Sequence, residues 1–250
     1  MTHAKTQISS LMSLKDVSMQ FGSFFALKDL SFDIRRGEIL GVAGPNGAGK
    51  STLLNVCTGG LSATSGKVLF NGTDITGSKQ HICCGLGIGR TFQIPTVLSS
   101  LTVGENILSG RIFGSEVKGQ YPNIPIEDVI ALADLSGDLN KQAGPADLLT
   151  RKRIMLGAAL ATGPQIIFMD EPLGGLNAEE IESFCALIEH IRQELGITIV
   201  MVEHKTRALA RVSDRILIIN FGKFVCIDTP EIVLNDDHVV EIYLGKKHNA

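Results

Sequence analysis

A glycine-rich segment that begins at residue 44 has the spacing of a phosphate-binding loop. Gly44, Gly49, Lys50 and Ser51 satisfy the pattern G-x-x-x-x-G-K-[ST]. The glycines let the backbone curve around an anion without a Cβ clash, and the N–H groups at the start of the following helix hold the negative charge. The pattern assigns the lysine to the β- and γ-phosphates of a nucleotide and the serine hydroxyl to Mg²⁺.

A glycine-rich turn could match the same pattern by chance, and the neighbouring segments decide between the two interpretations. The apolar segment Ile39–Ala43 before the pattern is typical of a short buried strand, and a helix is expected from Lys50 onwards. A strand, this loop and a helix are the context that a phosphate site requires. We therefore expect a nucleotide to bind here.

Two adjacent carboxylates follow the apolar segment 166–169. A P-loop protein places the acid that holds Mg²⁺ at such a strand end, which assigns Asp170 to the metal. Glu171 lies where the chain turns, and its carboxylate suits the orientation or deprotonation of an attacking water. The alternative for these two residues alone is an acidic turn in solvent, and the phosphate loop favours the site.

Two further polar residues, Gln93 and His204, each follow a predicted strand. Taken alone, each is more typical of an ordinary polar loop residue. The two residues become candidates for the site because they belong to an ordered series along the chain: the phosphate loop, Gln93, the acidic pair and His204.

The elements that must hold these side chains predict an α/β fold. Alternating apolar positions predict antiparallel strands at 14–21 and 30–34, and Asn71-Gly72 predicts a tight turn. Further strands are expected at 87–92, 166–169, 197–202 and 215–219, and a capping box formed by Asn177 and Glu180 begins an amphipathic helix. Strands that alternate with helices predict a largely parallel sheet.

The middle of the chain differs from the rest. Helices are expected near 102–113, 126–135 and 147–161, with irregular stretches rich in glycine, proline and asparagine between them. We expect a helical subdomain at about 94–156, inserted into a nucleotide-binding core that spans about 12–93 and 157–250.

The composition excludes several classes of protein. The net charge is −3 and the basic residues form no long run, so nothing points to nucleic acid. The five cysteines form no C-x-x-C pair, which favours a reduced compartment over a disulfide framework. The apolar runs are too short to span a membrane, and residues 1–10 lack the apolar stretch of a signal peptide.

The ordered series of motifs resembles the ATP-binding cassette (ABC) ATPases over essentially the whole chain. The segments that carry the resemblance are GPNGAGKST at 44–52, RTFQ at 90–93, IIFMDEP at 166–172, GGLN at 174–177 and VMVEH at 200–204. The resemblance implies a P-loop NTPase (RecA-like) core that binds ATP and Mg²⁺ and hydrolyses ATP.

The resemblance also implies individual contacts. Phe21 would stack on adenine, Gln93 would touch the metal site and relay to membrane subunits, and His204 would contact the γ-phosphate. Lys50 and Glu171 would join His204 in catalysis, and Ser51, Gln93 and Asp170 would surround the metal. The nucleotide contacts implied along the loop are Gly44, Pro45, Asn46, Gly47, Ala48, Gly49, Lys50, Ser51 and Thr52.

Four weaker motifs are similar to the ATPase subunits of branched-chain amino acid and of amide or urea importers. They are GRTFQ at 89–93, LTVGENI at 101–107, GLN at 175–177 and VVEIYLG at 239–245. They imply an importer subunit that drives uptake of a small polar solute from the cytoplasmic face of the inner membrane, as a peripheral protein.

The implied partners are membrane permease subunits, a second ATP-binding cassette and, indirectly, a periplasmic binding protein. Two alternatives stay open. One is a soluble ABC ATPase that is not tied to a permease, although such proteins usually carry two cassettes or long coiled-coil insertions. The other is a different P-loop class, such as a small-molecule kinase.

One family motif is altered. The LSGGQ-like signature begins a helix, and the family's spacing back from Asp170 places it at Ala146-Asp147-Leu148-Leu149-Thr150. Leu149 stands where the family has glycine, and Asp147 would bring a carboxylate toward a γ-phosphate. Asp147 is also a good helix N-cap, and Arg151 is a candidate to restore positive charge. The altered segment favours a heterodimer of cassettes, while a homodimer stays open.

Overall fold

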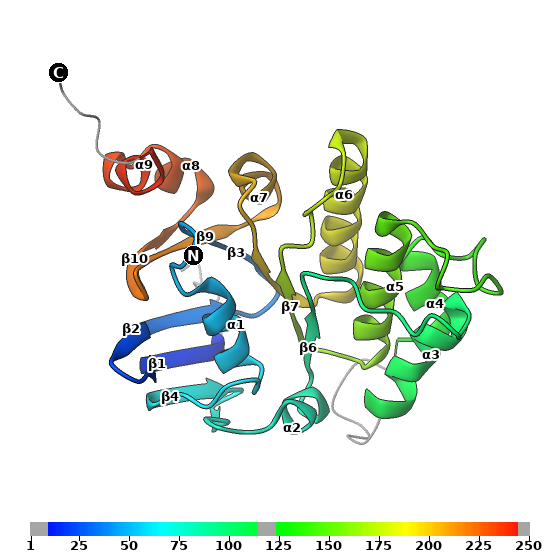
Figure 1. Cartoon of the computed structure of the whole chain (residues 1–250), viewed down its shortest axis with the longest axis horizontal. Helices are drawn as coiled ribbons and strands as arrows, with labels where there is room; N and C mark the ends of the chain where they lie inside the picture. The colour runs from blue at the N-terminus through cyan, green and yellow to red at the C-terminus, as the bar shows by residue number, and fades with distance from the viewer. Residues whose placement is uncertain (1–9, 115–123, 245–250) are drawn as a thin grey trace, which may run out of the picture.

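The nucleotide motifs belong to a largely parallel sheet at the centre of the chain (Figure 1). The computed structural model describes residues 10–114 and 124–244, and within them this sheet has six strands in the order β10-β9-β3-β8-β7-β6. Strands β9 to β6 in that order are parallel, and β10 pairs antiparallel with β9 at the edge. The strands are β3 (Ile39–Ala43), β6 (Ile88–Thr91), β7 (Ile166–Asp170), β8 (Thr198–Val202), β9 (Arg215–Asn220) and β10 (Lys223–Asp228). The predicted parallel sheet is confirmed.

A second, antiparallel sheet lies on one face of the first, with the order β2-β1-β4-β5 in the described residues. Its strands are β1 (Ser10–Phe21), β2 (Phe24–Arg35), β4 (Ser65–Phe70) and β5 (Thr73–Asp74). Asn71 and Gly72 join β4 to β5 with φ angles of 49° and 78°, the left-handed conformation that an Asn-Gly turn adopts. Both the predicted strand pair and the predicted turn are confirmed.

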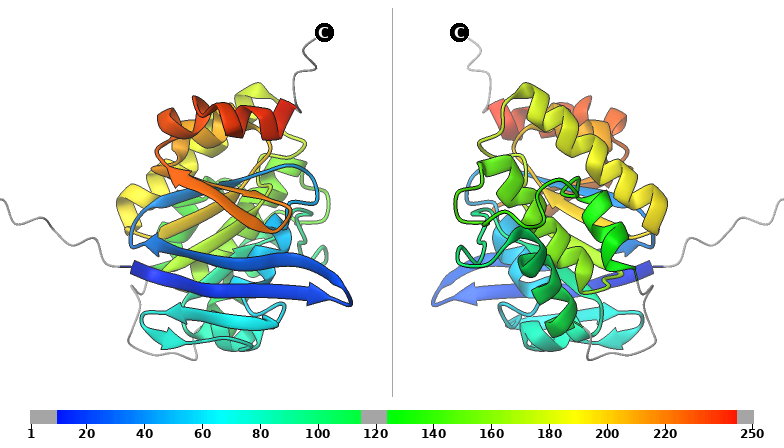
Figure 2. Two further views of the ribbon diagram at one scale, coloured as in Figure 1. Left: turned by 90° about the vertical axis from the view of Figure 1, so that its left-hand side faces the viewer. Right: turned by 90° about the vertical axis from the view of Figure 1, so that its right-hand side faces the viewer.

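Helices pack on both faces of the parallel sheet. They are α1 (Lys50–Cys57), α2 (Gln80–Gly85), α3 (Val103–Gly114), α4 (Ile126–Leu132), α5 (Leu148–Ala161), α6 (Ala178–Leu195), α7 (Thr206–Val212), α8 (Pro230–Leu234) and α9 (Asp237–Leu244). Of these, α1 and α2 lie with the antiparallel sheet, and α3 to α7 lie opposite. Figure 2 shows the two faces, with β1 and β2 toward the viewer in one panel and α3 to α6 in the other.

Burial on both faces explains why the parallel strands are apolar throughout. In β7, Ile166 and Phe168 pack with the antiparallel sheet, while Ile167 and Met169 pack with the helices. Successive strand residues point to opposite faces, so a strand with no exposed face carries no polar alternation. Strands β3, β7 and β8 each have five residues, and all of them are buried.

Helices α3, α4 and α5 pack against one another at the right of Figure 1, between β6 and β7 in the sequence. Their positions agree with the three helices predicted there. The second ends earlier than expected, at Leu132, because Asp134 adopts a left-handed φ of 53°. The division of the chain into a core and a helical subdomain stays a prediction.

Apart from the predicted strand β9, the elements over residues 206–244 were not predicted. They are helix α7 before β9, and strand β10 and helices α8 and α9 after it. The helices of the described ranges include none long and apolar enough to cross a bilayer. Two segments used in the sequence analysis extend beyond the described residues. They are residues 1–9, where no apolar stretch of a signal peptide was found, and Gly245, which ends the motif VVEIYLG.

Candidate nucleotide site

The phosphate loop joins the buried strand β3 to helix α1, as its motif requires. Gly44 and Gly49 have φ angles of 155° and 102°, and a Cβ atom on either would lie 2.1 Å and 2.4 Å from the carbonyl oxygens of Ile219 and Ala26. No side chain fits at either position. The two glycines therefore allow both the curvature of the loop and its close contact with β9 and β2.

Lys50 is the first residue of α1 and is 6% exposed. Its Nζ donates to the carbonyl oxygens of Gly44 and Pro45, at 2.7 and 2.9 Å. Burial lowers the pKa of Lys50, and the nearby carboxylates of Glu171 and Asp170 oppose that shift. The ammonium therefore lies inside the curve of the loop, where its charge faces the site.

Asp170 ends strand β7 beside Ser51 of α1. The Ser51 hydroxyl donates to an oxygen of Asp170 at 3.5 Å. Burial raises the pKa of Asp170, and the guanidinium of Arg90, 3.9 Å away, opposes that shift. A hydroxyl and a carboxylate that face each other are the hard oxygen ligands that Mg²⁺ prefers, so these residues fit the predicted ion.

Arg90 was named only as part of a motif, and the structure gives it specific partners. Its guanidinium donates to Asn55 and Thr58 of the α1 region, at 2.7 and 3.1 Å, while it faces Asp170. Strand β6 carries Arg90 beside β7 in parallel register. The sequence contained a signal for these contacts. An arginine within a predicted buried strand indicates a charged partner nearby, because burial of this residue type requires one.

Glu171 lies between the two other polar residues of the predicted series. Its Oε1 is 2.5 Å from Nε2 of His204, and its Oε2 accepts from Nε2 of Gln93 at 2.8 Å. The backbone of Glu171 has a φ of 47°, a conformation that side-chain-bearing residues adopt at a cost. The structure thus brings together three residues that lie far apart in the sequence. The metal contact of Gln93 stays a prediction.

A cleft of about 360 Å³ connects these groups with an aromatic wall. Glu171 and His204 line one part, and Phe21 and Phe24 line another. The loop residues that line it are Asn46, Gly47, Ala48, Gly49, Lys50, Ser51 and Thr52. Its mixture of exposed backbone N–H groups, one ammonium and exposed rings suits a nucleotide better than an apolar ligand.

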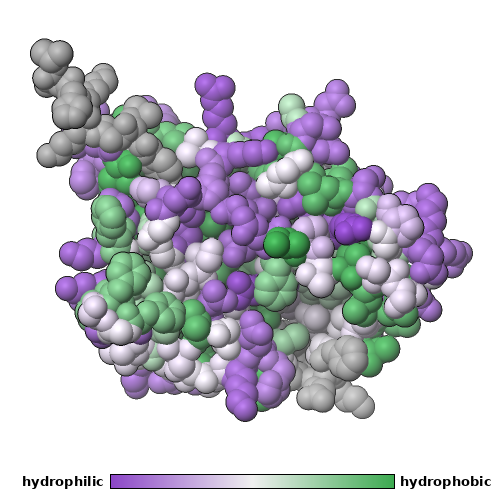
Figure 3. Space-filling model, in the orientation of Figure 1, coloured by the Kyte–Doolittle hydropathy of each residue, from purple (hydrophilic) through white to green (hydrophobic). Residues whose placement is uncertain are grey.

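Phe24 is an aromatic residue that the sequence analysis missed. It pairs directly with Phe21 across the β1–β2 turn, and the two side chains are 63% and 48% exposed. Figure 3 shows apolar residues gathered over the left-hand end of the antiparallel sheet, where this turn lies. The sequence contained a signal for this contact: only two residues separate Phe21 from Phe24, and a tight turn between them makes the two residues a cross-strand pair.

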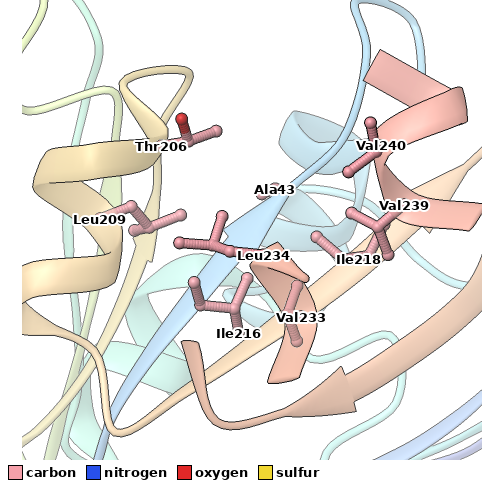
Figure 4. A pocket seen from close by; sticks show the side chains of 9 residues that line it. All are labelled: Ala43, Thr206, Leu209, Ile216, Ile218, Val233, Leu234, Val239 and Val240. Carbon is pink, nitrogen blue, oxygen red and sulfur yellow. The ribbon is translucent and has the colours of Figure 1, made fainter. Parts of the chain in front are cut away.

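A second cavity, of about 160 Å³, lies between the C-terminal helices and the parallel sheet (Figure 4). Leu209 of α7 and Leu234 of α8 reach toward each other across it, and Thr206 contributes a hydroxyl. Its other lining residues are Ala43, Ile216, Ile218, Val233, Val239 and Val240. With no charged side chain in its lining, this cavity does not fit a phosphate group.

The altered signature lies at the start of α5. Asp147 caps the helix by accepting from the N–H of Thr150 at 2.7 Å, and this bond is the main cause that lowers the pKa of Asp147. Leu149 packs against the core at the side of the helix. Arg151 donates to the carbonyl oxygens of Ala146 and Gly144, so its guanidinium holds the preceding loop. The N-cap interpretation of Asp147 is confirmed.

Comparison with known proteins identifies relatives along almost the whole chain. A family model described as "ABC transporter" matches residues 27–174. The high-affinity branched-chain amino acid transport ATP-binding protein LivG of Escherichia coli (strain K12) is 29% identical over 250 residues, covering 94% of this chain and 98% of LivG. The probable LivG protein of Methanocaldococcus jannaschii is 32% identical over 252 residues, with the same coverage. The sulfate/thiosulfate import ATP-binding protein CysA of Nitrosomonas europaea is 34% identical over 229 residues, covering 89% of this chain and 61% of CysA.

Solved structures give the same result. An ATP-binding cassette of an ABC transporter, crystallised in its ADP conformation, is 31% identical, with a TM-score of 0.84 over 95% of this chain and 100% of that one. A nucleotide-free cassette from an ABC transporter is 29% identical, with a TM-score of 0.84. The family model covers more than half of the chain, and the cleft joins the phosphate loop to Glu171 and His204. The chain therefore belongs to the ABC transporter family and is one of its nucleotide-binding ATPases.

Proposed function

We propose that this chain is the ATP-binding subunit of an importer and hydrolyses Mg-ATP to drive uptake of a small polar solute. The solute would be a branched-chain amino acid, an amide or urea. The observation that carries the proposal is the cleft, in which the phosphate loop, Glu171 and His204 face one another beside two aromatic side chains. The similarity to branched-chain amino acid transport proteins supports the choice of solute class.

The proposed chemistry uses the groups of the cleft. Lys50 would neutralise charge on the β- and γ-phosphates, and His204 would contact the γ-phosphate. Glu171 would orient the attacking water and accept its proton. Ser51 and Asp170 would hold Mg²⁺, with Gln93 at the same site. The bound ion would supply positive charge to the phosphate oxygens.

The proposed assembly places the chain at the cytoplasmic face of the inner membrane as a peripheral subunit. A nucleotide-binding core at about 12–93 and 157–250 would pair with the same part of a second cassette. A helical subdomain at about 94–156 would contact permease subunits, which in turn receive solute from a periplasmic binding protein. The close packing of α3, α4 and α5 supports this division.

Removal of the Lys50 charge tests nucleotide binding. Lys50→Ala should weaken Mg-ATP binding by about tenfold or more, because a charge-assisted contact with phosphate is lost. Calorimetric titration of the full chain with Mg-ATP measures the dissociation constant. Lys141→Ala is the matched control, since Lys141 is exposed and pairs only with Asp138 among the described residues. Unchanged affinity in Lys50→Ala would contradict the assignment.

Solute uptake tests the importer assignment separately. Cells that lack the gene for this chain should lose uptake of labelled leucine, urea or a short amide, and the wild-type chain should restore it. The Lys50→Ala chain should not restore uptake. Uptake of all three solutes at the wild-type rate in the deletion strain would favour a soluble ABC ATPase instead.

We also propose that the chain works in a heterodimer with two unequal ATP sites. In the family, the signature of one cassette completes the site of the other. The carboxylate of Asp147 at the start of α5, and the bulk of Leu149 nearby, support a poor fit to a partner's γ-phosphate. The complete phosphate loop supports hydrolysis at this chain's own site, closed by a partner with an intact signature.

Restoration of the family's residues tests the heterodimer. Asp147→Ser with Leu149→Gly should raise the ATPase rate of the purified chain by about 10² or more, since loss of one donor to developing charge costs that much. The wild-type chain alone should be a monomer with little activity in light scattering and phosphate-release assays. Brisk turnover by a wild-type homodimer, with no gain from the restored signature, would contradict the proposal.

A further inference from the structure

Two charged side chains lie fully inside the molecule next to Glu171. Lys152 of α5 and Glu203, which follows β8, are each 2% exposed. Burial lowers the pKa of Lys152 and raises the pKa of Glu203, while the attraction between their charges partly offsets the shift of Lys152. Buried charges persist only where the surrounding structure supplies them with partners, so the partners of this pair indicate what it does.

The partners of Glu203 are backbone N–H groups on two segments of the nucleotide site. One oxygen accepts from Leu173 at 2.6 Å, and the other accepts from His204 at 3.2 Å. Leu173 is completely buried and lies two residues after Glu171. The carboxylate therefore joins the loop after β7 to the start of the segment that carries His204.

The partner of Lys152 is Glu171 itself. Its Nζ lies 3.4 Å from the carbonyl oxygen of Glu171, which also accepts from the N–H of Gly174 at 3.1 Å. A third charged residue, Lys205, donates to the carbonyl oxygens of Leu173 and Leu176, at 3.0 and 3.3 Å. Three charged side chains thus hold the backbone of the loop 171–176.

The loop needs such support because of its first residue. Glu171 has a left-handed φ of 47°, and such a conformation persists only where its surroundings determine it. The same residue aims its carboxylate at Gln93 and His204. A shift of the backbone at Glu171 would move both oxygens of that carboxylate.

We propose that Lys152 and Glu203 are positioning residues that fix the loop 171–176 and thereby the carboxylate of Glu171. This inference rests on the proposed role of Glu171 in hydrolysis. Lys152 belongs to α5, the helix that Asp147 caps and that carries the altered signature. Because a helix moves as a rigid element, displacement of the start of α5 is transmitted through Lys152 to Glu171 of the same chain.

Loss of the ammonium tests the inference in the assembly in which the wild-type chain hydrolyses ATP. Lys152→Met keeps the length of the side chain and should lower kcat by about 10²-fold, as expected for a misplaced catalytic group. The dissociation constant for Mg-ATP should change by less than about threefold, because no atom of Lys152 lies in the cleft. Lys152→Arg, which keeps a donor, should recover part of the lost rate.

Two controls separate positioning from loss of stability. Leu156→Ala removes a buried apolar side chain from the same helix and should lower the melting temperature without the loss of kcat. The double variant Lys152→Met with Glu203→Gln should recover melting temperature, because the buried negative charge that lost the attraction of Lys152 is gone. Its kcat should stay low, because the contact with Glu171 is still absent.

Hydrogen exchange gives a result that does not depend on activity. In Lys152→Met, the amides of residues 173–176 should exchange about tenfold faster than in the wild type, while those of α1 are unchanged. Wild-type kcat together with wild-type exchange in Lys152→Met would overturn this inference and leave the proposed function intact. Absence of hydrolysis in every wild-type assembly would overturn both.

Discussion

The carboxylate of Glu171 has a partner on each oxygen, and its backbone adopts a left-handed φ of 47°. One partner, Gln93, comes from the loop after β6, and the other, His204, follows β8. A single acidic side chain therefore joins the ends of two strands that lie on either side of β7. The contacts fix the direction of the carboxylate, and its proposed task is to accept a proton from water.

Glu171→Gln tests that task directly. The amide keeps the size of the side chain but cannot accept a proton, so single-turnover hydrolysis in the assembled transporter should slow by about 10² or more. Binding of Mg-ATP, measured by calorimetry, should change by less than about threefold. Glu179→Gln, at an exposed acid of α6, is the control and should behave as the wild type. Equal turnover in both variants would show that Glu171 is not the catalytic carboxylate.

The free energy of unfolding of this chain should depend on pH in the alkaline range, because the chain buries two thiols. Burial raises the pKa of Cys57 to about 12 and the pKa of Cys185 to about 11. The unfolded thiols ionise near pH 8.5, so the stability linked to them is complete below about pH 8.5 and is lost as pH rises toward the folded values. Each thiol lowers the free energy of unfolding by at most about 1.4 kcal/mol per pH unit in that window.

Urea unfolding between about pH 7 and pH 10.5 measures this dependence. Cys57→Ala with Cys185→Ala should be less stable than the wild type at pH 7, because two small cavities are created. The difference should shrink as pH rises. A difference that stays constant across the range would contradict the prediction.

At the scale of elements, α5 begins at a residue with two separable effects. The side chain of Asp147 satisfies the N–H of Thr150, and it also places a negative charge at the helix start. Capping stabilises this chain, whereas the charge opposes a phosphate from a partner. A neutral cap would keep the first effect and remove the second.

Asp147→Ala should therefore lower the free energy of unfolding by about 1 kcal/mol, while Asp147→Ser should leave it nearly unchanged. In a chain of this length, about 1 kcal/mol corresponds to a shift of about 2–4 °C in melting temperature. Differential scanning calorimetry measures both variants. Equal melting temperatures for Asp147→Ala and the wild type would show that the capping bond adds nothing.

The segment after Gln93 exposes apolar side chains, and we predict that it couples the ATPase to a permease. Ile94 and Leu98 are 78% and 51% exposed. Ile94→Ser with Leu98→Ser should leave Mg-ATP affinity unchanged and lower solute uptake per ATP hydrolysed by about tenfold, as for loss of buried apolar contacts at an interface. Ile232→Ser, at an exposed position of α8, is the control. Normal coupling in the double variant would contradict this prediction.

The elements of the site were predictable where each has one strong cause. Strands buried on both faces give continuous apolar runs such as residues 166–169, and phosphate binding demands Gly44 and Gly49. The turn into β10 was not predictable, because Phe221 has a positive φ of 46° that its residue type does not favour. The burial of Lys152 and Glu203 was also missed, since their partners are backbone groups of a distant loop.

At the scale of the whole molecule, one parallel sheet separates two apolar clusters, and the same strands contribute to both. Val42 packs in one cluster and Ala43 in the other. Neither cluster can open without exposing strands of the other, so we expect cooperative unfolding.

Calorimetry tests this expectation with the Glu171→Gln chain, in which ATP is not consumed. The chain should unfold in one transition, and Mg-ATP at about 100 times its dissociation constant should stabilise it by about 2.7 kcal/mol. For a chain of this length that corresponds to about 5–10 °C. Two separate transitions, of which Mg-ATP shifts only one, would contradict the shared core.

The two contacts to the carboxylate of Glu171 also affect how much ATP is hydrolysed by copies of the chain that have no partner subunits. A water that gives up its proton to Glu171 must compete with Gln93 and His204 for the same oxygens. If Glu171 is the base that we propose, a copy without partners binds ATP and hydrolyses little of it. Uneven synthesis of the subunits would then drain little of the cell's energy supply, and no separate inhibitor would be needed to prevent waste.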